Sequence, residues 1–167
     1  MNEGPPDVHR MTRQEIGAVS ALARAVWQTT YPALISQAQI DSMLADRYAA
    51  AQIEMQCADP AHGWWVACRN GSLVGFAHAM TGEGDCKLDK LYVHPAQQRN
   101  GVGAGLLAAV RPWCAQHQMR RLWLQVNRGN DQAIAAYRKY GFHIVESRLF
   151  DIGQGFVMDD YIMEQAL

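Results

Sequence analysis

The chain has 167 residues, of which 49% are hydrophobic and 19% are charged, and its formal net charge is −1. This composition is typical of a globular protein, and the length predicts a single domain over residues 1–167. The near-zero charge provides no long-range field for nucleic acid or an acidic membrane, and no apolar run approaches the roughly 20 residues that span a bilayer, so we expect neither partner.

The N-terminal third predicts a strand followed by helices. Residues Asp7 to Met11 have the pattern of a short strand. Apolar residues then recur with helical period from Thr12 or Arg13 to about Thr30, and Pro32 ends this segment. Apolar positions between Ile40 and Met55 indicate one or two further helices.

The middle of the chain predicts a three-stranded antiparallel meander. Two apolar runs, Trp64–Cys68 and Leu73–Met80, flank an Asn70-Gly71 pair. Asn-Gly between two such runs indicates a tight hairpin, because both turn positions need a positive φ. A Gly-rich turn over residues 81–85 then leads into a third strand over Lys87–Val93.

The second half alternates helices and strands. The expected order is a helix over Val102–His117, a strand over Leu122–Val126, a helix over Asp131–Tyr140, and closing strands over Phe142–Phe150 and Phe156–Met163. Pro112 inside the first helix implies a kink or an earlier end. Strand, helix, strand, helix indicates a short parallel crossover within a largely antiparallel sheet, so the fold class is mixed α/β (α+β).

Cysteine and histidine spacing predicts no metal site. The cysteines are Cys57, Cys68, Cys86 and Cys114, without a C-x-x-C pair, and the histidines form neither H-x-x-H nor H-E-x-x-H. The stretch Met1–Arg10 lacks the apolar core of a signal peptide, so we expect reduced thiols and a cytoplasmic location.

A glycine-rich turn is the most informative feature of the chain. Gly101, Gly103 and Gly105 follow a predicted strand and open a predicted helix. Bare backbone N–H groups at a helix N-terminus form an anion cradle, so we expect a phosphate or pyrophosphate there. Glycine costs roughly 1 kcal/mol against alanine inside a helix, so three in this stretch need a reason such as close approach to a ligand, the alternative being a plain helix start.

Two familiar phosphate-binding motifs are excluded by spacing. A dinucleotide-binding fold requires G-x-G-x-x-G near its first strand, and a P-loop requires lysine directly after its second glycine. The chain instead has Gln98-Arg99-Asn100-Gly101-Val102-Gly103. This motif resembles the acyl-CoA signature of the GCN5-related N-acetyltransferase (GNAT) family. A second stretch, Asn130-x-x-Ala133-x-x-x-Tyr137-x-Lys139-x-Gly141-Phe142, resembles the family's downstream signature.

The resemblance covers about residues 62–165 and implies both a fold and a cofactor. The implied fold is a mixed, mostly antiparallel sheet of six to seven strands, flanked by helices, with a splayed central parallel pair. The implied co-substrate is acetyl-CoA, with its pyrophosphate on residues 99–104 and its pantetheine arm bonded to the strand at Leu91 and Val93. The cofactor-binding residues implied in this way are Leu91, Tyr92, Val93, Gln98, Arg99, Asn100, Gly101, Val102, Gly103, Ala104, Asn130 and Tyr137.

The same resemblance suggests catalytic residues. Tyr137 occupies the family's tyrosine position near the CoA sulfur, where a phenol can protonate a leaving thiolate, although a tyrosine packed on the sheet is the alternative. Asp89 is the candidate base, acting directly or through water. Strand alternation places it on one face with Leu91 and Val93, opposite Leu88, Lys90 and Tyr92, unless a backbone bulge shifts it. The alternatives are an exposed or salt-bridged aspartate, and an amine that loses its proton to solvent. Asn130 is expected to bond pantetheine or to cap the following helix.

The acceptor is expected to be a small-molecule amine. Trp27-x-x-Thr30-Tyr31-Pro32 and the acidic tail around Asp151, Asp159 and Asp160 resemble the bacterial branch that acetylates spermine and spermidine, so a polyamine is the finer expectation. Ordinary solvated turn aspartates are the alternative for the tail. Two other readings stay open: a protein N-terminus or lysine as acceptor, and a non-catalytic acyl-CoA-binding module. A homodimer is the assembly that the resemblance suggests.

Overall fold

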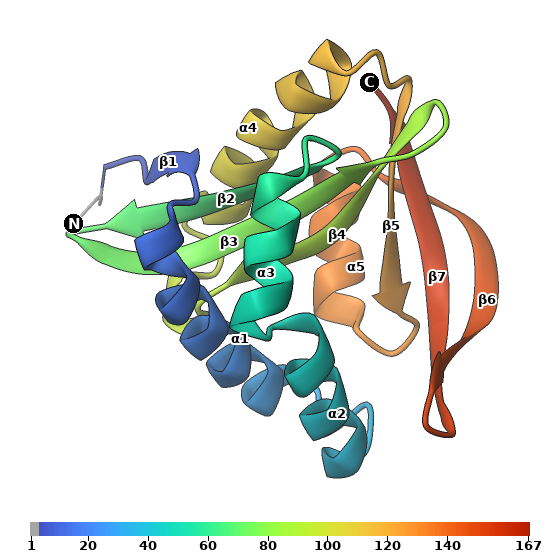
Figure 1. The fold of residues 1–167 in the computed structure, drawn as a ribbon. Coiled ribbons are helices and arrows are strands. Elements are labelled where there is room, and N and C mark those ends of the chain that lie inside the picture. Colours follow the sequence, from blue (N-terminus) through green and yellow to red (C-terminus); the bar gives the residue numbers. More distant parts are fainter. Residues whose placement is uncertain (1–3) are drawn as a thin grey trace.

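The computed structural model describes residues 4–167 of the chain, so residues 1–3 of the predicted domain lie outside the described part. A seven-stranded mixed sheet in the order β1-β2-β3-β4-β5-β7-β6 forms its centre (Figure 1). The strands are β1 (Asp7–Arg10), β2 (His62–Arg69), β3 (Ser72–Thr81), β4 (Asp85–Val93), β5 (Arg121–Asn127), β6 (His143–Gly153) and β7 (Phe156–Ala166). The predicted meander is confirmed as β2–β3–β4, and the Asn70-Gly71 turn has φ values of 51° and 78°.

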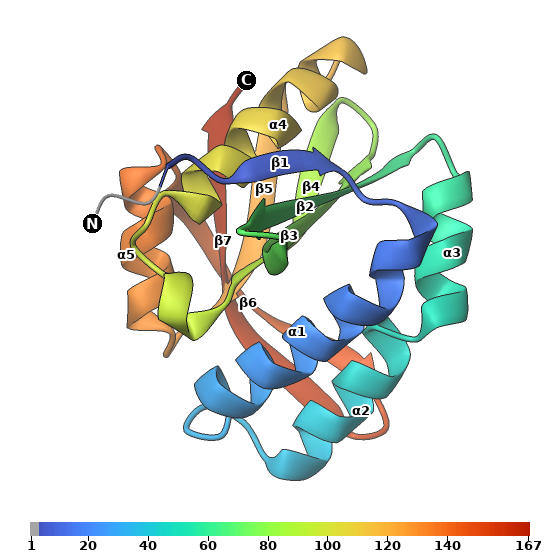
Figure 2. The ribbon, with the colours of Figure 1, turned by 90° about the vertical axis from the view of Figure 1, so that its left-hand side faces the viewer.

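Helices cover both faces of the sheet (Figures 1 and 2). They are α1 (Ile16–Thr30), α2 (Gln37–Arg47), α3 (Ala50–Ala58), α4 (Val102–Gln116) and α5 (Asp131–Lys139), with short 3-10 turns η1 (Arg13–Glu15) and η2 (Pro95–Gln97). Within residues 4–167 none of these helices is both long and apolar enough to cross a bilayer.

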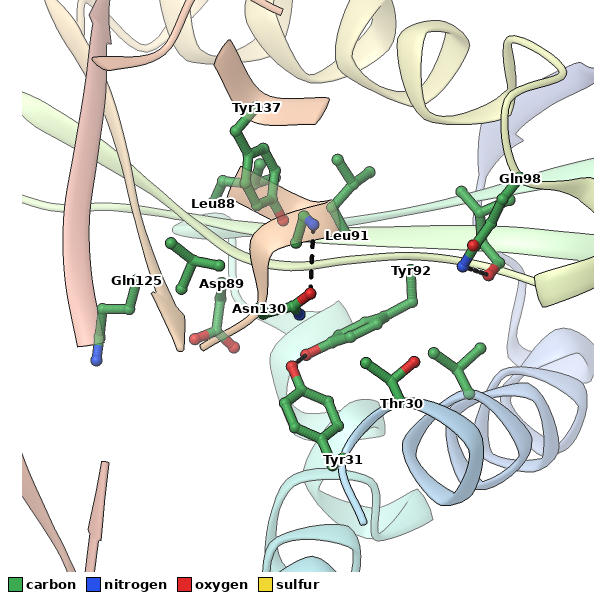
Figure 3. Close-up of a pocket in the computed structure, with 14 residues that line it drawn as sticks. Thr30, Tyr31, Leu88, Asp89, Leu91, Tyr92, Gln98, Gln125, Asn130 and Tyr137 are labelled. Atoms are coloured by element: carbon green, nitrogen blue, oxygen red, sulfur yellow. Dashed lines mark hydrogen bonds between the residues drawn. The ribbon is translucent and has the colours of Figure 1, made fainter. Parts of the chain in front are cut away.

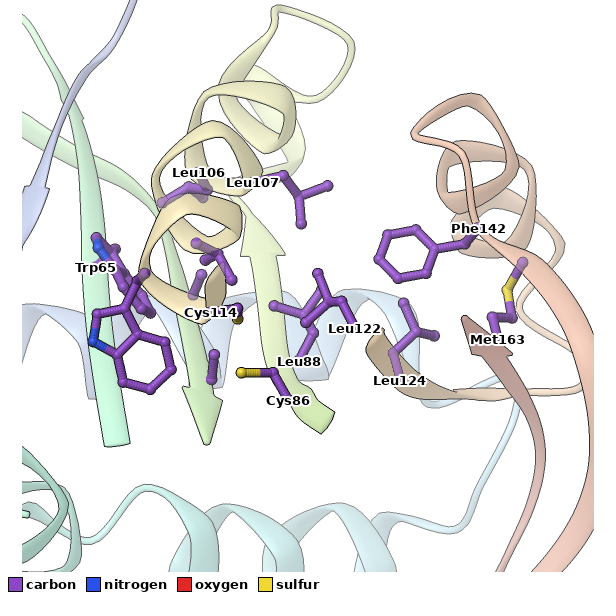
Figure 4. Packing of buried hydrophobic residues seen from close by; sticks show 14 of the residues in the cluster. Trp65, Cys86, Leu88, Leu106, Leu107, Cys114, Leu122, Leu124, Phe142 and Met163 are labelled. Carbon is purple, nitrogen blue, oxygen red and sulfur yellow. The ribbon is translucent and has the colours of Figure 1, made fainter. Parts of the chain in front are cut away.

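Two hydrophobic clusters hold these layers together. One lies between the sheet and helices α4 and α5, and Figure 4 shows Leu106 and Leu107 of α4 facing Leu88 and Leu122 of the central strands. The other joins the opposite face to α1, α2 and α3. The neighbours Trp64 and Trp65 belong to different clusters and are both buried, because successive strand residues point to opposite faces.

The parallel strands β4 and β5 pair only at their beginnings. Three residue pairs, from Asp85↔Arg121 to Lys87↔Trp123, join them, and β5 pairs with β7 along its whole length. From Leu88 onward β4 therefore has no strand beside it on the β5 side. The predicted splayed pair is confirmed, and it leaves backbone groups of β4 at an open edge.

A β-bulge in β4 corrects the predicted face assignment. His78 pairs with Lys90 and Ala79 with Leu88, so Asp89 is the extra residue. The bulge changes which residues share a face. Leu88, Leu91 and Val93 pack in the hydrophobic cluster between the sheet and α4, while Tyr92 packs in the cluster on the opposite face, against α1. The alternation of an unbroken strand, with Leu88 and Tyr92 on one face, was wrong, and the bulge that had been left open as the alternative occurs at Asp89.

Helix α4 continues through Pro112 to Gln116, so the expected earlier end did not occur. Proline lacks the N–H that would bond to the carbonyl of residue 108, but Pro112 is exposed. Water can therefore satisfy that carbonyl, and the helix tolerates the lost bond.

Candidate functional site

A cavity of about 100 Å³ lies where β4 and β5 separate (Figure 3). Its walls come from β4, β5, the start of α5 and the last turn of α1. Seven of the predicted site residues line it: Asp89, Leu91, Tyr92, Val93, Gln98, Asn130 and Tyr137. Residues that are nearly 50 positions apart in sequence thus meet at the split in the sheet.

Tyr137 projects from α5 into this cavity (Figure 3). Its ring packs edge-on against Phe142, with centroids 5.7 Å apart. Among residues 4–167 its hydroxyl has no hydrogen-bond partner, although the side chain is half-buried. Burial raises the pKa of Tyr137 above that of a free phenol, and the charges of Tyr31 and Tyr140 act in the same direction, so the hydroxyl keeps its proton at neutral pH.

Asn130 caps helix α5, which confirms one of the two roles expected for it. Its Oδ1 accepts a hydrogen bond from the backbone N–H of Ala133 at 3.2 Å. The side chain also lines the cavity, and within the described residues its Nδ2 has no acceptor. The cap fixes the start of α5, while one amide group stays available to a ligand.

Asp89 reaches the cavity with its carboxylate already paired. Its Oδ2 lies 3.0 Å from His78 Nδ1 and 2.5 Å from Lys90 Nζ, and Lys87 Nζ lies 3.6 Å from its other oxygen. Burial alone would raise the pKa of Asp89, but the bond from His78 and the charges of Lys90 and Lys87 hold it well below its usual range. The alternative of a salt-bridged aspartate therefore describes the geometry, and the carboxylate stays ionised near neutrality.

A pair of hydrogen-bonded histidines, of which His78 is buried and His62 is half-buried, supports Asp89 from behind. His78 is fully buried, stacks on Trp64, and burial lowers its pKa to about 4. A neutral His78 must donate its Nδ1–H to the carboxylate, so its Nε2 accepts from His62 Nδ1 at 2.8 Å. The orientation of Asp89 thus depends on β2 and β3 as well as on its own bulge.

A second carboxylate, Asp160, lies behind the Gln125 part of the cavity wall. The hydroxyl groups of Tyr31 and Tyr92 lie 3.2 Å apart at the cavity wall, and Gln125 Nε2 donates to Asp160 Oδ2 at 3.3 Å. Asp160 is only 2% exposed, and within residues 4–167 its Oδ1 has no partner. Burial raises the pKa of Asp160.

The other two acidic residues of the tail are ordinary surface groups. Asp159 is exposed and pairs with Arg128 at 3.2 Å, and Asp151 accepts a turn hydrogen bond from the N–H of Gly153. A more open cavity of about 470 Å³ adjoins this region and is bounded by Leu34, Gln39 and Val157 among others.

The predicted anion turn precedes α4. Within the described residues, the backbone N–H groups of residues 99–104 have no acceptor. Arg99 and Gly101 adopt φ values of 68° and 80°, which fold the chain back toward the helix start. The turn therefore presents a row of free donors next to a helix N-terminus, as the sequence predicted.

Contacts from distant residues brace this turn. Arg69, at the end of β2, donates to the carbonyl of Asn100 at 2.6 Å and to Gln97 Oε1 at 3.1 Å. Gln98 donates to the carbonyl of Val93 at 3.3 Å and accepts from Gln132 Nε2 of α5 at 2.9 Å. Gln98 thus connects the end of β4 to α5, and Arg69 is a site residue that the motif alone could not reveal.

Packing alone requires neither Gly103 nor Gly105. A Cβ on Gly103 would lie 2.6 Å from the Tyr140 hydroxyl, which is the far end of a half-buried side chain that can move, and one on Gly105 would lie at an ordinary contact distance of 3.4 Å from Pro6 and Val8. Gly101 needs its positive φ. The conformation of the turn thus accounts for Gly101, and the N–H groups of residues 99–104, which have no acceptor within the described residues, are the direct evidence for an anion site.

Sequence reasoning missed part of the cavity wall. Val26, Thr30 and Tyr31 come from the end of α1, and Gln125 comes from β5. The sequence pattern could have predicted the orientation of Gln125, because this residue lies between the buried residues Leu124 and Val126 and must therefore point to the other face of the sheet. Thr30 and Tyr31 had a signal as well, because they belong to the stretch that resembles the polyamine-acetylating branch, whereas the place of Val26 depends on packing between distant elements.

Comparison with known proteins adds independent information. A sequence profile described as the acetyltransferase (GNAT) family matches residues 23–142. The chain is 29% identical over 150 residues to an uncharacterized N-acetyltransferase of Mycobacterium tuberculosis, covering 89% of this chain and 96% of the relative. It is 35% identical over 82 residues to the peptidyl-lysine N-acetyltransferase YiaC of Escherichia coli, covering 49% of this chain and 51% of the relative.

Similarity to proteins of Thermoplasma acidophilum is lower in identity but extends over nearly the whole chain. A spermidine N(1)-acetyltransferase from that organism is 20% identical over 157 residues, which is 92% of this chain and 95% of the relative. The crystal structure of its PaiA N-acetyltransferase in complex with coenzyme A has a TM-score of 0.84 at 20% identity, covering 98% of this chain and 100% of that one. The fold described above is therefore the fold of that structure.

Proposed function

Because this chain belongs to the acetyltransferase (GNAT) family, we propose that it transfers the acetyl group of acetyl-CoA to a primary amine of a small molecule, by direct attack in a ternary complex. The observation that carries the proposal is the cavity at the β4–β5 split, where the hydroxyl of Tyr137, which has no hydrogen-bond partner within residues 4–167, meets the open edge of β4.

The anion turn fits the diphosphate of acetyl-CoA. Its free N–H groups at residues 99–104 and the positive end of α4 suit a doubly charged group, and Arg69 holds the turn in place. The open edge of β4 around Leu91 and Val93 suits the two amides of pantetheine, which need partners when they leave water. Asn130 Nδ2 is a further donor from the facing helix.

The cavity itself is too small for the whole co-substrate. At about 100 Å³ it is well below the roughly 300–1,000 Å³ of sites that enclose a complete ligand. It is therefore suited to the reacting end of a longer molecule. When bound, acetyl-CoA supplies an acetyl group activated as a thioester.

Tyr137 and Asp89 have opposite roles toward protons. Tyr137 Oη keeps its proton because burial raises its pKa, so it is the donor for the departing sulfur. Asp89 stays ionised beside Lys90, so it orients the incoming ammonium and the water through which the proton leaves, and it retains a proton poorly itself.

Two features support a small cationic amine over a peptide. The helix α2 is bonded to the β6–β7 hairpin, since Gln39 Nε2 donates to the carbonyl of Val157 at 3.1 Å and Ser42 Oγ lies 3.4 Å from Gln154 Oε1. Since α2 and the hairpin contact each other directly, an extended peptide cannot pass between them. Asp160 is buried behind Gln125 of the cavity wall, and its Oδ1 has no partner within residues 4–167, so its carboxylate favours a cationic group at that wall.

The test is release of CoA thiol over a panel of polyamines, amino acids, aminoglycosides and lysine or N-terminal peptides. We expect turnover with at least one small amine and a kcat/KM for peptides at least tenfold lower. Preferred turnover of peptides would replace the small-molecule assignment with a protein acceptor. Tight acetyl-CoA binding with no turnover on any acceptor would identify a non-catalytic acyl-CoA-binding module.

A further inference from the structure

Three ligand-type side chains meet at the sheet edge, away from the cavity. His9 lies on β1, Cys68 on β2 and Glu15 in η1, and their ligand atoms all lie within 4.8 Å of one another. The register of β1 with β2 pairs Asp7 with Cys68 and His9 with Val66, which puts His9 and Cys68 on one face of the sheet. β1 is the edge strand, with β2 and β3 between it and β4 (Figure 1).

We propose that His9, Glu15 and Cys68 form a binding site for a single Zn²⁺ ion. An imidazole nitrogen, a carboxylate oxygen and a thiolate sulfur are the ligand types that zinc takes, at about 2.0–2.3 Å each. Ligand atoms within 4.8 Å of one another can close to the ~3.3–3.7 Å separations of a tetrahedral site by small side-chain rotations. Water occupies the fourth position.

The surrounding contacts already orient two of the ligands. His9 Nε2 lies 3.0 Å from Glu15 Oε2, while its other nitrogen, Nδ1, lies 3.4 Å from Asp7 Oδ2. A carboxylate on the far nitrogen is the usual partner of a metal-bound histidine, because it fixes the tautomer and the ring orientation. Asp7 therefore leaves Nε2 as the nitrogen directed at Glu15 and Cys68.

Glu15 is held in the same way. Its Oε1 accepts bonds from Thr12 N at 2.8 Å and Thr12 Oγ1 at 3.1 Å, in a capping box at the start of η1. This leaves Oε2 as the oxygen available to the metal. The side chains of His9 and Glu15 are 36% and 21% exposed, and Cys68 is half-buried, so an ion can enter from solvent.

Binding has a defined proton balance. Zn²⁺ bonds to Nε2, Oε2 and Sγ, and the thiol proton of Cys68 leaves to solvent. His9 binds as the neutral imidazole with its one proton on Nδ1 toward Asp7, so a second ring proton, where the ring carries one, also leaves to solvent. The ion would join β1, β2 and the turn that begins α1. Its expected effect is on the stability of the N-terminal edge, since β1 contributes only four residues to the sheet.

The site can be tested with tag-free, full-length protein and Co²⁺ or Zn²⁺ as probes. We expect one Co²⁺ per chain, with a near-ultraviolet thiolate-to-cobalt band that Zn²⁺ abolishes, and a higher Tm with Zn²⁺. Cys68→Ser and His9→Gln should each weaken binding by more than about 100-fold, and Asp7→Asn by about 10–100-fold. Cys57→Ser, which changes an exposed cysteine on α3, is the matched control and should bind normally.

Two outcomes would overturn the proposal. One is no saturable Co²⁺ or Zn²⁺ binding by the folded wild-type chain. The other is binding of the same affinity in wild type, Cys68→Ser and His9→Gln, each shown to be folded by circular dichroism. Acetyl transfer is not a readout here, so these results are independent of the proposed function.

Discussion

Replacing Tyr137 with phenylalanine isolates one hydroxyl group with little structural disturbance. The ring contact with Phe142, at 5.7 Å between centroids, is retained in the variant. The hydroxyl has no hydrogen-bond partner within residues 4–167, so its loss strands no protein group. We therefore expect the unfolding free energy to change by less than about 0.5 kcal/mol.

The kinetic effect should be large by comparison. General acid catalysis contributes about 10²–10⁴-fold, and even a tenfold loss of kcat corresponds to about 1.4 kcal/mol in the barrier. We predict at least a tenfold fall in kcat, measured by CoA thiol release, with acetyl-CoA affinity by calorimetry changed less than about twofold. Because burial raises the pKa of Tyr137, the wild-type rate should not decline through its ionisation below about pH 10.

The matched control is Tyr161→Phe, which removes a hydroxyl from β7 on the α4 side of the sheet, outside the cavity wall. It should leave both kcat and affinity unchanged. Wild-type kcat in Tyr137→Phe would remove the phenol from the mechanism, and equal losses in both variants would show that the effect is not specific to the cavity.

Three further perturbations test other parts of the account. Ala104→Glu adds a negative charge to the exposed first turn of α4 and should weaken acetyl-CoA binding at least tenfold in calorimetry. A tenfold loss corresponds to the repulsion energy of two unit charges about 6 Å apart at an effective dielectric constant of about 40. Ala108→Glu, one turn later on the same helix, is the control and should bind acetyl-CoA normally. Burial lowers the pKa of His78 to about 4, so the unfolded chain binds a proton at this residue more readily than the folded chain does. The free energy of unfolding, measured by urea titration, should therefore fall by about 2 kcal/mol as the pH is lowered from about 7.5 to about 5. His78→Gln should flatten that dependence while the exposed-site variant His143→Gln keeps it, and an unchanged slope in His78→Gln would contradict the assignment. Asp160→Asn should raise the KM for a cationic acceptor several-fold while leaving the KM for acetyl-CoA and the Tm unchanged. Asp159→Asn, which changes an exposed residue, should leave all three quantities unchanged. Equal acceptor KM values in both variants would exclude Asp160 from recognition.

The order of the elements could be predicted from sequence because the signals are local. The Asn70-Gly71 turn, the alternation of Leu122, Leu124 and Val126, and the helix cap at Asn130 each depend on a few neighbouring residues. The glycine turn was found for the same reason, although the packing of Gly103 against Tyr140 could not be foreseen.

What the sequence did not reveal depends on residues far apart in the chain. Arg69 braces a turn 31 positions away, and the bulge at Asp89 is visible only once β3 and β4 are paired. The cluster of His9, Glu15 and Cys68 shows this dependence on distant residues even more clearly. Spacing along the chain argued against a metal site, but the pairing of β1 with β2 brings a cysteine 59 residues later beside the histidine (68 − 9 = 59).

In the proposed function, the turn before α4 and the open edge of β4 hold acetyl-CoA with its thioester at Tyr137. A crystal structure of the chain with bound CoA tests this most directly. We predict the diphosphate within hydrogen-bond distance of the N–H groups of residues 99–104 and the sulfur beside Tyr137 Oη. A nucleotide bound elsewhere on the molecule, with this turn making no contact to it, would contradict the account.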